Sequence, residues 1–325
     1  MDMMSNKDKF YDQTNVSCSA FRTTQLDFVT NIILCLVLSV FMFGALILNA
    51  IVIVYINKRR KHKEFTRFFL TSLATVDLLV GITLMPFSIA NEFMEMKQLL
   101  GVTACSAMNS LDVMLTSASI IHLSVLTFER YIALCKPFSY GRVCNRKNMF
   151  IMFIMSWILV ATVSFGFIMP GFHHLGIDPF ILTCIENVSR QCRFVVNIYY
   201  DLIISSVTIF IPGFFIFGFN TLVMKHVRKQ STKRKFYLTC GGQSRNHRNG
   251  SESQSLHIAK TIAVLTGSFF LFWSPFFIVT KILVFTKYNM PYIVEIAVIW
   301  LGYANSCINP LLFLLLQSKT CIGKR

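Results

Sequence analysis

Long stretches without charged residues alternate with short polar segments along the whole chain. Residues 28–57 contain no Asp, Glu, Lys or Arg, and a helix of about 20 apolar residues is long enough to cross a membrane. Stretches of similar length recur, some with an acidic residue inside or at one end: residues 28–57, 68–90, 105–131, 148–172, 202–224, 261–280 and 296–318. This pattern predicts an all-α membrane protein, a single bundle of seven transmembrane helices over residues 28–318.

The charge content and its distribution predict how the bundle is oriented. Charged residues make up 14% of the chain, well below the roughly 25% of soluble domains. The net charge is +16, and most basic residues follow segments one, three, five and seven. Because basic loops stay in the cytoplasm, residues 1–27 are predicted to form an extracellular tail and residues 319–325 a short cytoplasmic tail. The basic loops favour contact with anionic membrane lipid over nucleic acid.

The loops on the two sides differ in the chemistry that their compartments allow. Four cysteines fall on the predicted outer side, where disulfides persist, and they can pair in three ways: Cys18, Cys105, Cys184 and Cys192. Asn15 and Asn187 begin glycosylation motifs on that same side. Residues 229–255 are rich in Ser, Arg, Gln and Gly, and this composition predicts a flexible third cytoplasmic loop.

Asp112 is the first candidate for a binding residue. Eighteen positions separate it from Arg130, and residues 113–128 carry no charge, so the two side chains lie roughly 27 Å apart along a helix. A carboxylate inside a membrane costs several kcal/mol and therefore faces a polar cavity or a partner. One alternative is a structural acid paired with a neighbouring helix. However, no Lys, Arg or His stands at its depth in another segment, which favours pairing with an external cation.

Aromatic residues surround the predicted depth of Asp112. Trp273, Phe276 and Phe277 cluster around the proline of segment six, and Trp300 and Tyr303 lie on one face of segment seven. Rings beside a carboxylate form a site for a protonated amine, because cation–π contacts add to the ion pair. Ordinary core packing is the competing interpretation in a chain with 32 Phe, and it accounts for most of these aromatic residues.

Two further acidic residues lie near the predicted mouth of this site, Asp201 before segment five and Glu295 at the start of segment seven. A second carboxylate facing Asp112 would favour a diamine or polyamine ligand. Alternatively, both acids are solvated rim residues that pair with Arg193 or Lys287, since exposed acids at helix ends are common.

A second polar group is predicted deeper in the bundle. Asp77 lies in the middle of segment two, at the depth of Ser119, Asn305 and Asn309. Their oxygen atoms suit a hard cation such as sodium, and a hydrogen-bonded cluster with water is the equal alternative. No other metal or cofactor is expected, and no enzyme motif occurs: there is no Walker loop, no His-Glu-x-x-His and no Gly-x-Ser-x-Gly.

Several motifs occur in order at the spacing of the seven segments. They are Asn49, Ser72-Leu-Ala-Thr-Val-Asp77, Cys105, Glu129-Arg130-Tyr131, Trp157, Pro212, Trp273-Ser-Pro275 and Asn309-Pro310. Together they resemble rhodopsin-like G-protein-coupled receptors over nearly the whole chain. Asp112-Val-Met-Leu-Thr-Ser-Ala-Ser-Ile120 looks like the aminergic branch. The run from Trp300 to Pro310 is similar to trace amine-associated receptors and to some serotonin receptors.

The resemblance implies a plasma-membrane receptor, not an enzyme, for an extracellular amine. Asp112 would hold the amine among the rings named above, and the resemblance adds Thr116 and Ser205 to the binding set. Glu129, Arg130 and Tyr131 would engage a heterotrimeric G protein, one that raises cAMP. It also implies the disulfides Cys105–Cys192 and Cys18–Cys184.

Three departures from the family pattern bear on signalling. Phe313 and Asn220 stand where the family usually has tyrosine, and Ser255 replaces an acid that often pairs with Arg130. A weakly signalling or scavenging receptor and a serotonin-like receptor are therefore kept as alternatives. A transporter with Asp77 and Asp112 as a relay is a third alternative, although no inverted repeat supports it.

Overall fold

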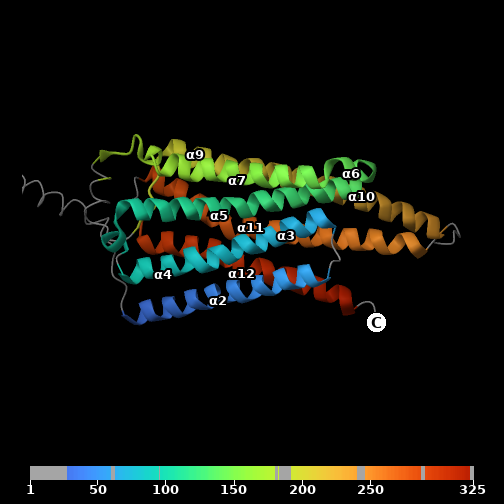
Figure 1. The fold of residues 1–325 in the computed structure, drawn as a ribbon, viewed down its shortest axis with the longest axis horizontal. Helices are drawn as coiled ribbons and strands as arrows, with labels where there is room; N and C mark the ends of the chain where they lie inside the picture. The colour runs from blue at the N-terminus through green and yellow to red at the C-terminus, as the bar shows by residue number, and fades with distance from the viewer. Residues whose placement is uncertain are drawn as a thin grey trace, which may run out of the picture.

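The computed structural model describes residues 28–59, 63–94, 96–179, 182, 192–239, 246–286 and 290–322 (Figure 1). Long helices dominate this part of the chain, and it contains no strand. The helices are α2 (Phe28–Arg59), α3 (Glu64–Leu79), α4 (Met85–Met94), α5 (Met96–Cys135), α6 (Tyr140–Val143), α7 (Arg146–Ile168), α9 (Ile198–Ser205), α10 (Ile211–Thr239), α11 (Asn246–Phe285) and α12 (Tyr292–Ile322). Two π-helical turns, Val80–Leu84 and Ser206–Phe210, join α3 to α4 and α9 to α10.

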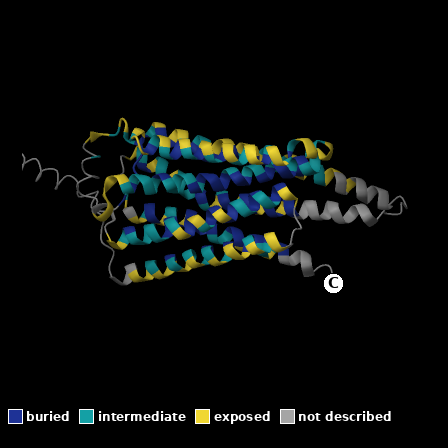
Figure 2. Cartoon of the chain, viewed as in Figure 1, coloured by how far each residue is buried: buried dark blue, intermediate teal, exposed yellow. Residues whose placement is uncertain are grey.

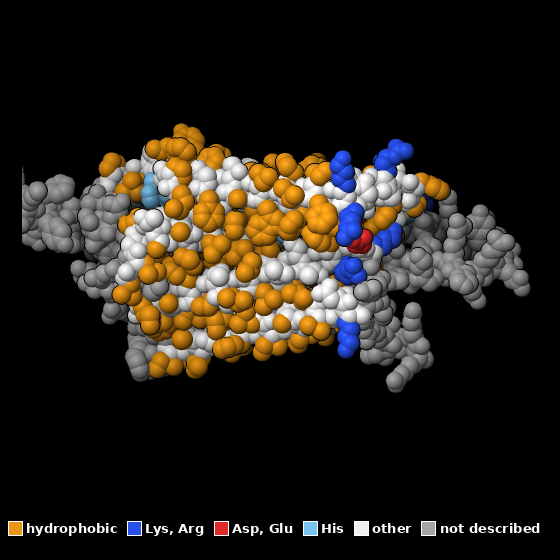
Figure 3. All heavy atoms as spheres, viewed as in Figure 1, with side chains coloured by type: hydrophobic (Ala, Val, Ile, Leu, Met, Phe, Trp, Pro, Cys, Tyr) orange, Lys and Arg blue, Asp and Glu red, His pale blue; other side chains and the backbone are white. Residues whose placement is uncertain are grey.

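Seven apolar spans within the described residues are long enough to cross a membrane: Ile32–Lys58, Glu64–Met94, Leu99–Cys135, Arg146–Ile168, Ile198–Lys229, Ile258–Phe285 and Ile293–Gln317. Each overlaps one segment predicted from the sequence, so the prediction of a seven-helix membrane bundle is confirmed. Apolar side chains cover the middle of the face in Figure 3, and Lys and Arg gather at one end. That end is the predicted cytoplasmic one.

Helix α5 is the central element of the bundle. It packs against α3, α7, α10 and α11, and its side chains Leu115, Ile120, Leu123 and Leu126 are at most 1% exposed. By contrast, α2 turns much of its surface outward, as the exposed Val40 illustrates. Figure 2 shows the same difference between the inner and outer helices. A side chain on α5 therefore meets several helices at once.

The two π-helical turns are explained by the prolines that follow them. Pro86 and Pro212 each lie two residues beyond a π turn. Proline has no N–H to donate, and its ring collides with the carbonyl group four residues earlier. A wider turn before the proline relieves that collision and bends the helix. The bend sets the direction of α9, which carries Asp201.

The structure differs from the sequence prediction at the third cytoplasmic loop. Helix α10 continues to Thr239 and α11 begins at Asn246, so most of residues 229–255 are helical rather than a flexible linker. The side chain of Ser255 lies outside the described set. Several predicted features also fall there, so they stay predictions: Asn15, Cys18, Cys184, Asn187 and Lys287.

Candidate functional site

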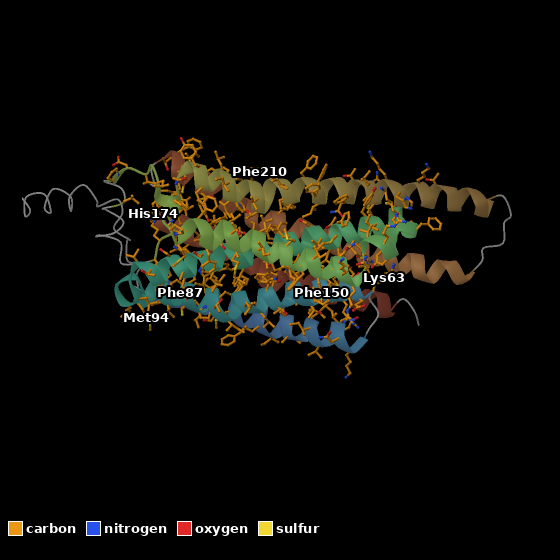
Figure 4. The ribbon with its side chains drawn as sticks, turned by 45° about the horizontal axis from the view of Figure 1, so that its top comes forward. Lys63, Phe87, Met94, Phe150, His174 and Phe210 are labelled. Atoms are coloured by element: carbon orange, nitrogen blue, oxygen red, sulfur yellow. A yellow bond between two sulfur atoms is a disulfide. The ribbon has the colours of Figure 1, made fainter. Side chains whose placement is uncertain are left out.

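A cavity of about 140 Å³ opens between α4, α5, α9, α11 and α12, away from the basic end of the bundle. Phe87 lines the cavity, and Figure 4 labels it near the end of the bundle opposite to Lys63. Most of the predicted binding residues line the cavity: Asp112, Thr116, Asp201, Trp273, Phe276, Phe277, Glu295 and Tyr303. Trp300 and Ser205 do not line it.

The Asp112 carboxylate has one oxygen whose hydrogen-bonding capacity is unmet. Its Oδ1 is buried and has no hydrogen-bond partner among the described groups. The hydroxyl of Tyr303 lies beside the carboxylate, and no described Lys, Arg or His forms an ion pair with it. An unpaired buried charge is strongly unfavourable, so this arrangement is suited to a cation that enters from outside.

Aromatic side chains form the floor of the cavity. The rings of Trp273 and Phe276 meet edge to face with centroids 5.6 Å apart, and Phe276 and Phe277 do so at 5.4 Å. Gly302 of α12 lets the Trp273 indole lie directly against the helix backbone. Trp300 instead packs edge to face on Tyr303 at 5.6 Å, so it supports that ring and stays away from the cavity.

An extended segment, residues 192–197, crosses the mouth of the cavity. The predicted disulfide Cys105–Cys192 is present and ties the segment to α5. The backbone N–H of Cys192 donates to Asn91 Oδ1 at 2.7 Å, and that of Asn197 donates to the His173 carbonyl at 2.7 Å. Burial, followed by the neighbouring His174, lowers the pKa of His173 to about 4, so the imidazole at this anchor is neutral at physiological pH.

Glu295 is paired with a cation of the same segment. Arg193 donates from Nε to Glu295 Oε2 at 2.9 Å and from Nη2 to Oε1. Both side chains are less than 10% exposed. The pairing is one that the sequence suggested, but it is buried rather than solvated.

Asp201 is also paired, with a lysine that the sequence analysis did not consider. Lys281 Nζ donates to Asp201 Oδ2 at 2.8 Å and to Ser205 Oγ at 2.9 Å. Lys281 is the one charged residue between Thr261 and Phe285. The predicted fifth segment began at residue 202, so Asp201 was interpreted as an acid at a helix end, and the predicted sixth segment ended at residue 280, one residue before Lys281. The sequence feature that could have pointed to this pair is the isolated charge of Lys281, about two helical turns beyond Trp273.

The predicted polar group around Asp77 forms a second, smaller site. Ser306 Oγ donates to Asp77 Oδ1 at 2.8 Å, and Ser268 Oγ donates to Asn309 Oδ1 at 3.2 Å. Asp77 Oδ2 and Asn305 Oδ1 are buried without a partner among the described groups. A cavity of about 20 Å³ touches Asp77 and Asn309, which is enough room for a water-sized guest. Ser119 Oγ turns to its own helix, 3.5 Å from the Leu115 carbonyl.

At the basic end, Arg130 is buried in a network with Glu129. Arg130 donates from Nε and Nη2 to the two Glu129 oxygens at 2.5 Å, and from Nη2 also to Thr66 Oγ1. Tyr140 donates to Glu129 at 2.8 Å. Burial, followed by the Glu129 charge, raises the pKa of Tyr140 well above its usual range, so its hydroxyl remains a donor. This network ties α3, α5 and α6 together.

Two residues beside this network extend it toward the surface. Lys63 Nζ lies 3.5 Å above the Tyr140 ring, and Lys63 is labelled at this end in Figure 4. Phe138, in the turn before α6, is fully exposed.

Comparison with known proteins identifies the protein family that shares this architecture. Residues 48–313 match the family model described as 7 transmembrane receptor (rhodopsin family). The human protein named 5-hydroxytryptamine receptor 4 is 31% identical, over 90% of this chain and 78% of its own. The mouse trace amine-associated receptor 1 is 29% identical, over 85% and 82%. The octopamine receptor beta-2R of Chilo suppressalis is 29% identical, over 85% and 74%.

Proposed function

The chain belongs to the rhodopsin family of seven-transmembrane receptors, and we propose that it binds an extracellular protonated amine at Asp112 and signals through a heterotrimeric G protein. The observation that carries the proposal is the buried Asp112 oxygen with no partner among the described groups, next to an aromatic floor. An ammonium would pair with this carboxylate and contact the faces of nearby rings. The family consists of receptors, so the chain is a receptor and not an enzyme.

The ligand is proposed to carry one ammonium group. Asp201 and Glu295, the two acids that suggested a diamine, each face a cation of the chain itself. For Asp112, by contrast, no such pair exists among the described residues. A small aromatic or aliphatic monoamine of the trace-amine class fits that charge pattern. A serotonin-like biogenic amine is the second candidate, because the human 5-hydroxytryptamine relative aligns over 90% of the chain.

The first test replaces Asp112 by Asn and measures cAMP with a panel of phenethylamine, tyramine, octopamine and serotonin. Loss of one partner of a desolvated ion pair should lower potency by about thirtyfold or more, while surface expression persists. Glu64→Gln is the matched control, because Glu64 is exposed at the opposite end of the bundle and its loss should leave potency unchanged. Unaltered potency in Asp112→Asn would reject the assignment. The panel also separates trace amines from serotonin.

Coupling to the G protein is proposed at the end that carries Glu129, Arg130 and Tyr131. Membership of the rhodopsin family supports a G-protein contact there, and the basic surface around it suits the anionic lipid of the inner leaflet. We propose a stimulatory G protein. If the chain is instead a scavenging receptor, amines will compete for binding at Asp112 while cAMP stays flat.

Sodium is proposed as the guest of the smaller site. Unpartnered oxygens of Asp77 and Asn305, with Asn309 on the cavity wall, are the ligand type that a hard cation takes. Replacing sodium by a large organic cation should then change amine affinity in wild type and not in Asp77→Asn. Equal affinity of the wild type in both salts would leave water as the occupant.

A further inference from the structure

The position of Lys281 suggests a role in ligand choice. We propose that Lys281 is a specificity-determining residue: it neutralises Asp201 and thereby restricts the cavity to ligands with a single ammonium. This inference rests on the proposed function, because it assumes that Asp112 binds an amine in the same cavity. It concerns a different pair of residues, which can be changed without touching Asp112.

The ion pair has one member on the cavity wall and one outside the lining. Asp201 lines the cavity, whereas Lys281 does not. The Lys281 ammonium lies 2.8 Å from Asp201 Oδ2 and is fixed by a second bond to Ser205 Oγ at 2.9 Å. The Asp201 side chain is 4% exposed and that of Lys281 is 27% exposed. A ligand therefore meets Asp201 as half of a neutral pair.

The charges explain how this pair excludes a second ammonium. A cation approaching Asp201 would come close to the Lys281 ammonium, and the repulsion would cancel most of the attraction in a site of low dielectric. Without Lys281, the carboxylate would be buried and uncompensated, which is strongly unfavourable. A ligand ammonium could then take the place of the lysine. Asp112 and Asp201 share one cavity and differ in whether the chain supplies the counter-charge.

Two other acids also line the cavity. Glu295 is paired with Arg193, and Glu92 also lines the cavity and takes part in an interaction of its own. A gain of diamine binding is therefore assigned to Asp201 only when removal of Asp201 abolishes it. That requirement fixes the design of the test.

The test compares pentylamine with cadaverine, its diamine of the same chain length, in competition binding and cAMP assays. Wild type should prefer pentylamine. Lys281→Gln should raise the affinity for cadaverine by roughly tenfold or more while the response to pentylamine and its dependence on Asp112 persist. Lys281→Arg is the matched control, because it keeps the positive charge and should keep the wild-type preference.

The double variant Asp201→Asn/Lys281→Gln should lose the cadaverine gain. Persistence of the gain there would point to another acid and overturn the proposal, as would a wild type that already prefers cadaverine or a Lys281→Gln variant without any gain. If Lys281→Gln fails to reach the cell surface, the Asp201→Asn variant provides the test. In that variant Lys281 has lost its carboxylate partner, so the receptor should bind the ω-amino acid of the same chain length, whose carboxylate can pair with Lys281, better than the wild type does. A different result tests the proposed function: if the response to pentylamine survives Asp112→Asn, the receptor does not bind the amine at Asp112.

Discussion

Asp112 and Asp201 show how neighbouring side chains decide the role of chemically identical residues. Both line one cavity. Asp201 accepts a hydrogen bond from Lys281, which also donates to Ser205, while Asp112 Oδ1 has no such partner among the described groups. Burying a charge without a partner is costly, and such a cost is retained where a ligand relieves it. At the residue scale, the binding site is therefore marked by an unmet hydrogen-bonding requirement.

Gly302 is a second single position on which the site depends. A Cβ there would lie 2.9–3.0 Å from three carbon atoms of the Trp273 ring, which is too close for undisturbed packing. Gly302→Ala is expected to displace the indole, cost about 1–3 kcal/mol and lower amine potency.

Gly166→Ala is the matched control, because its Cβ would meet only Thr162 at 3.8 Å, an ordinary contact. Thermal unfolding of the purified receptor and cAMP dose–response curves measure both effects. Equal stability and potency in the two alanine variants would show that the close approach of Gly302 is unimportant.

At the scale of an element, the short helix α9 is oriented from its first turn. Asn197 caps it by accepting from the Tyr200 N–H at 2.7 Å, and its amide also donates to the Phe172 carbonyl at 2.8 Å. The π turn at Ser206–Phe210, which precedes Pro212, then joins α9 to α10 and determines the angle between these two helices. Cap and π turn together determine where Asp201 meets Lys281.

Asn197→Ala should remove both the cap and the link to Phe172. A lost cap costs typically about 1 kcal/mol, so the melting temperature should fall by a few degrees. Amine affinity should fall as well, because α9 loses its fixed direction. Competition binding and thermal unfolding are the measurements.

Asn145→Ala provides the comparison, because Asn145 caps α7 at the other end of the bundle in the same way, accepting from the Asn148 N–H at 2.8 Å. It should lower the melting temperature to a similar extent and leave amine affinity intact. An equal loss of affinity in both variants would mean that general destabilisation, rather than the orientation of α9, is responsible.

For the whole molecule, the cavity and the Arg130 network lie at opposite ends of α5. Arg130 is only 3% exposed and Glu129 is fully buried, so a partner cannot reach Arg130 in this arrangement. A ligand activates such a receptor only if it binds more tightly to the arrangement in which the network is open. Bonds from Thr66 to both charged residues hold the closed arrangement.

Thr66→Val keeps the shape of this side chain and removes its hydroxyl. Hydrogen bonds to charged groups contribute about 1.5–3 kcal/mol, so the population of the open arrangement, and with it basal cAMP, should rise by about tenfold. Thr75→Val is the control, since the exposed Thr75 bonds only to Thr71 of its own helix. Basal cAMP per surface receptor that is the same in both variants would contradict the proposed restraint on Arg130.

The periodicity and composition of the sequence were enough to predict the membrane-spanning helices of this protein. A run of 20 or more apolar residues has no stable place outside a membrane, and the backbone inside one must satisfy its own hydrogen bonds as a helix. The seven spans follow from that requirement, and Asp112 stands out as a charge inside one of them, whereas the role of the motif around Arg130 rested on the family resemblance. Composition was a less reliable guide to secondary structure at residues 229–255, because α10 and α11 continue as helices beyond their membrane-spanning parts.

What only the tertiary structure decided is which charges meet. Lys281 and Asp201 are 80 positions apart, and Arg193 and Glu295 are separated by 102. Those pairs depend on how α9, α11, α12 and the segment after Cys192 face one another, which no local pattern contains. The same holds for Trp300 and Ser205, both turned away from the cavity. The sequence by itself indicated that a carboxylate inside the membrane faces a polar cavity or a partner, and packing decided which acids of the cavity pair with a cation of the chain.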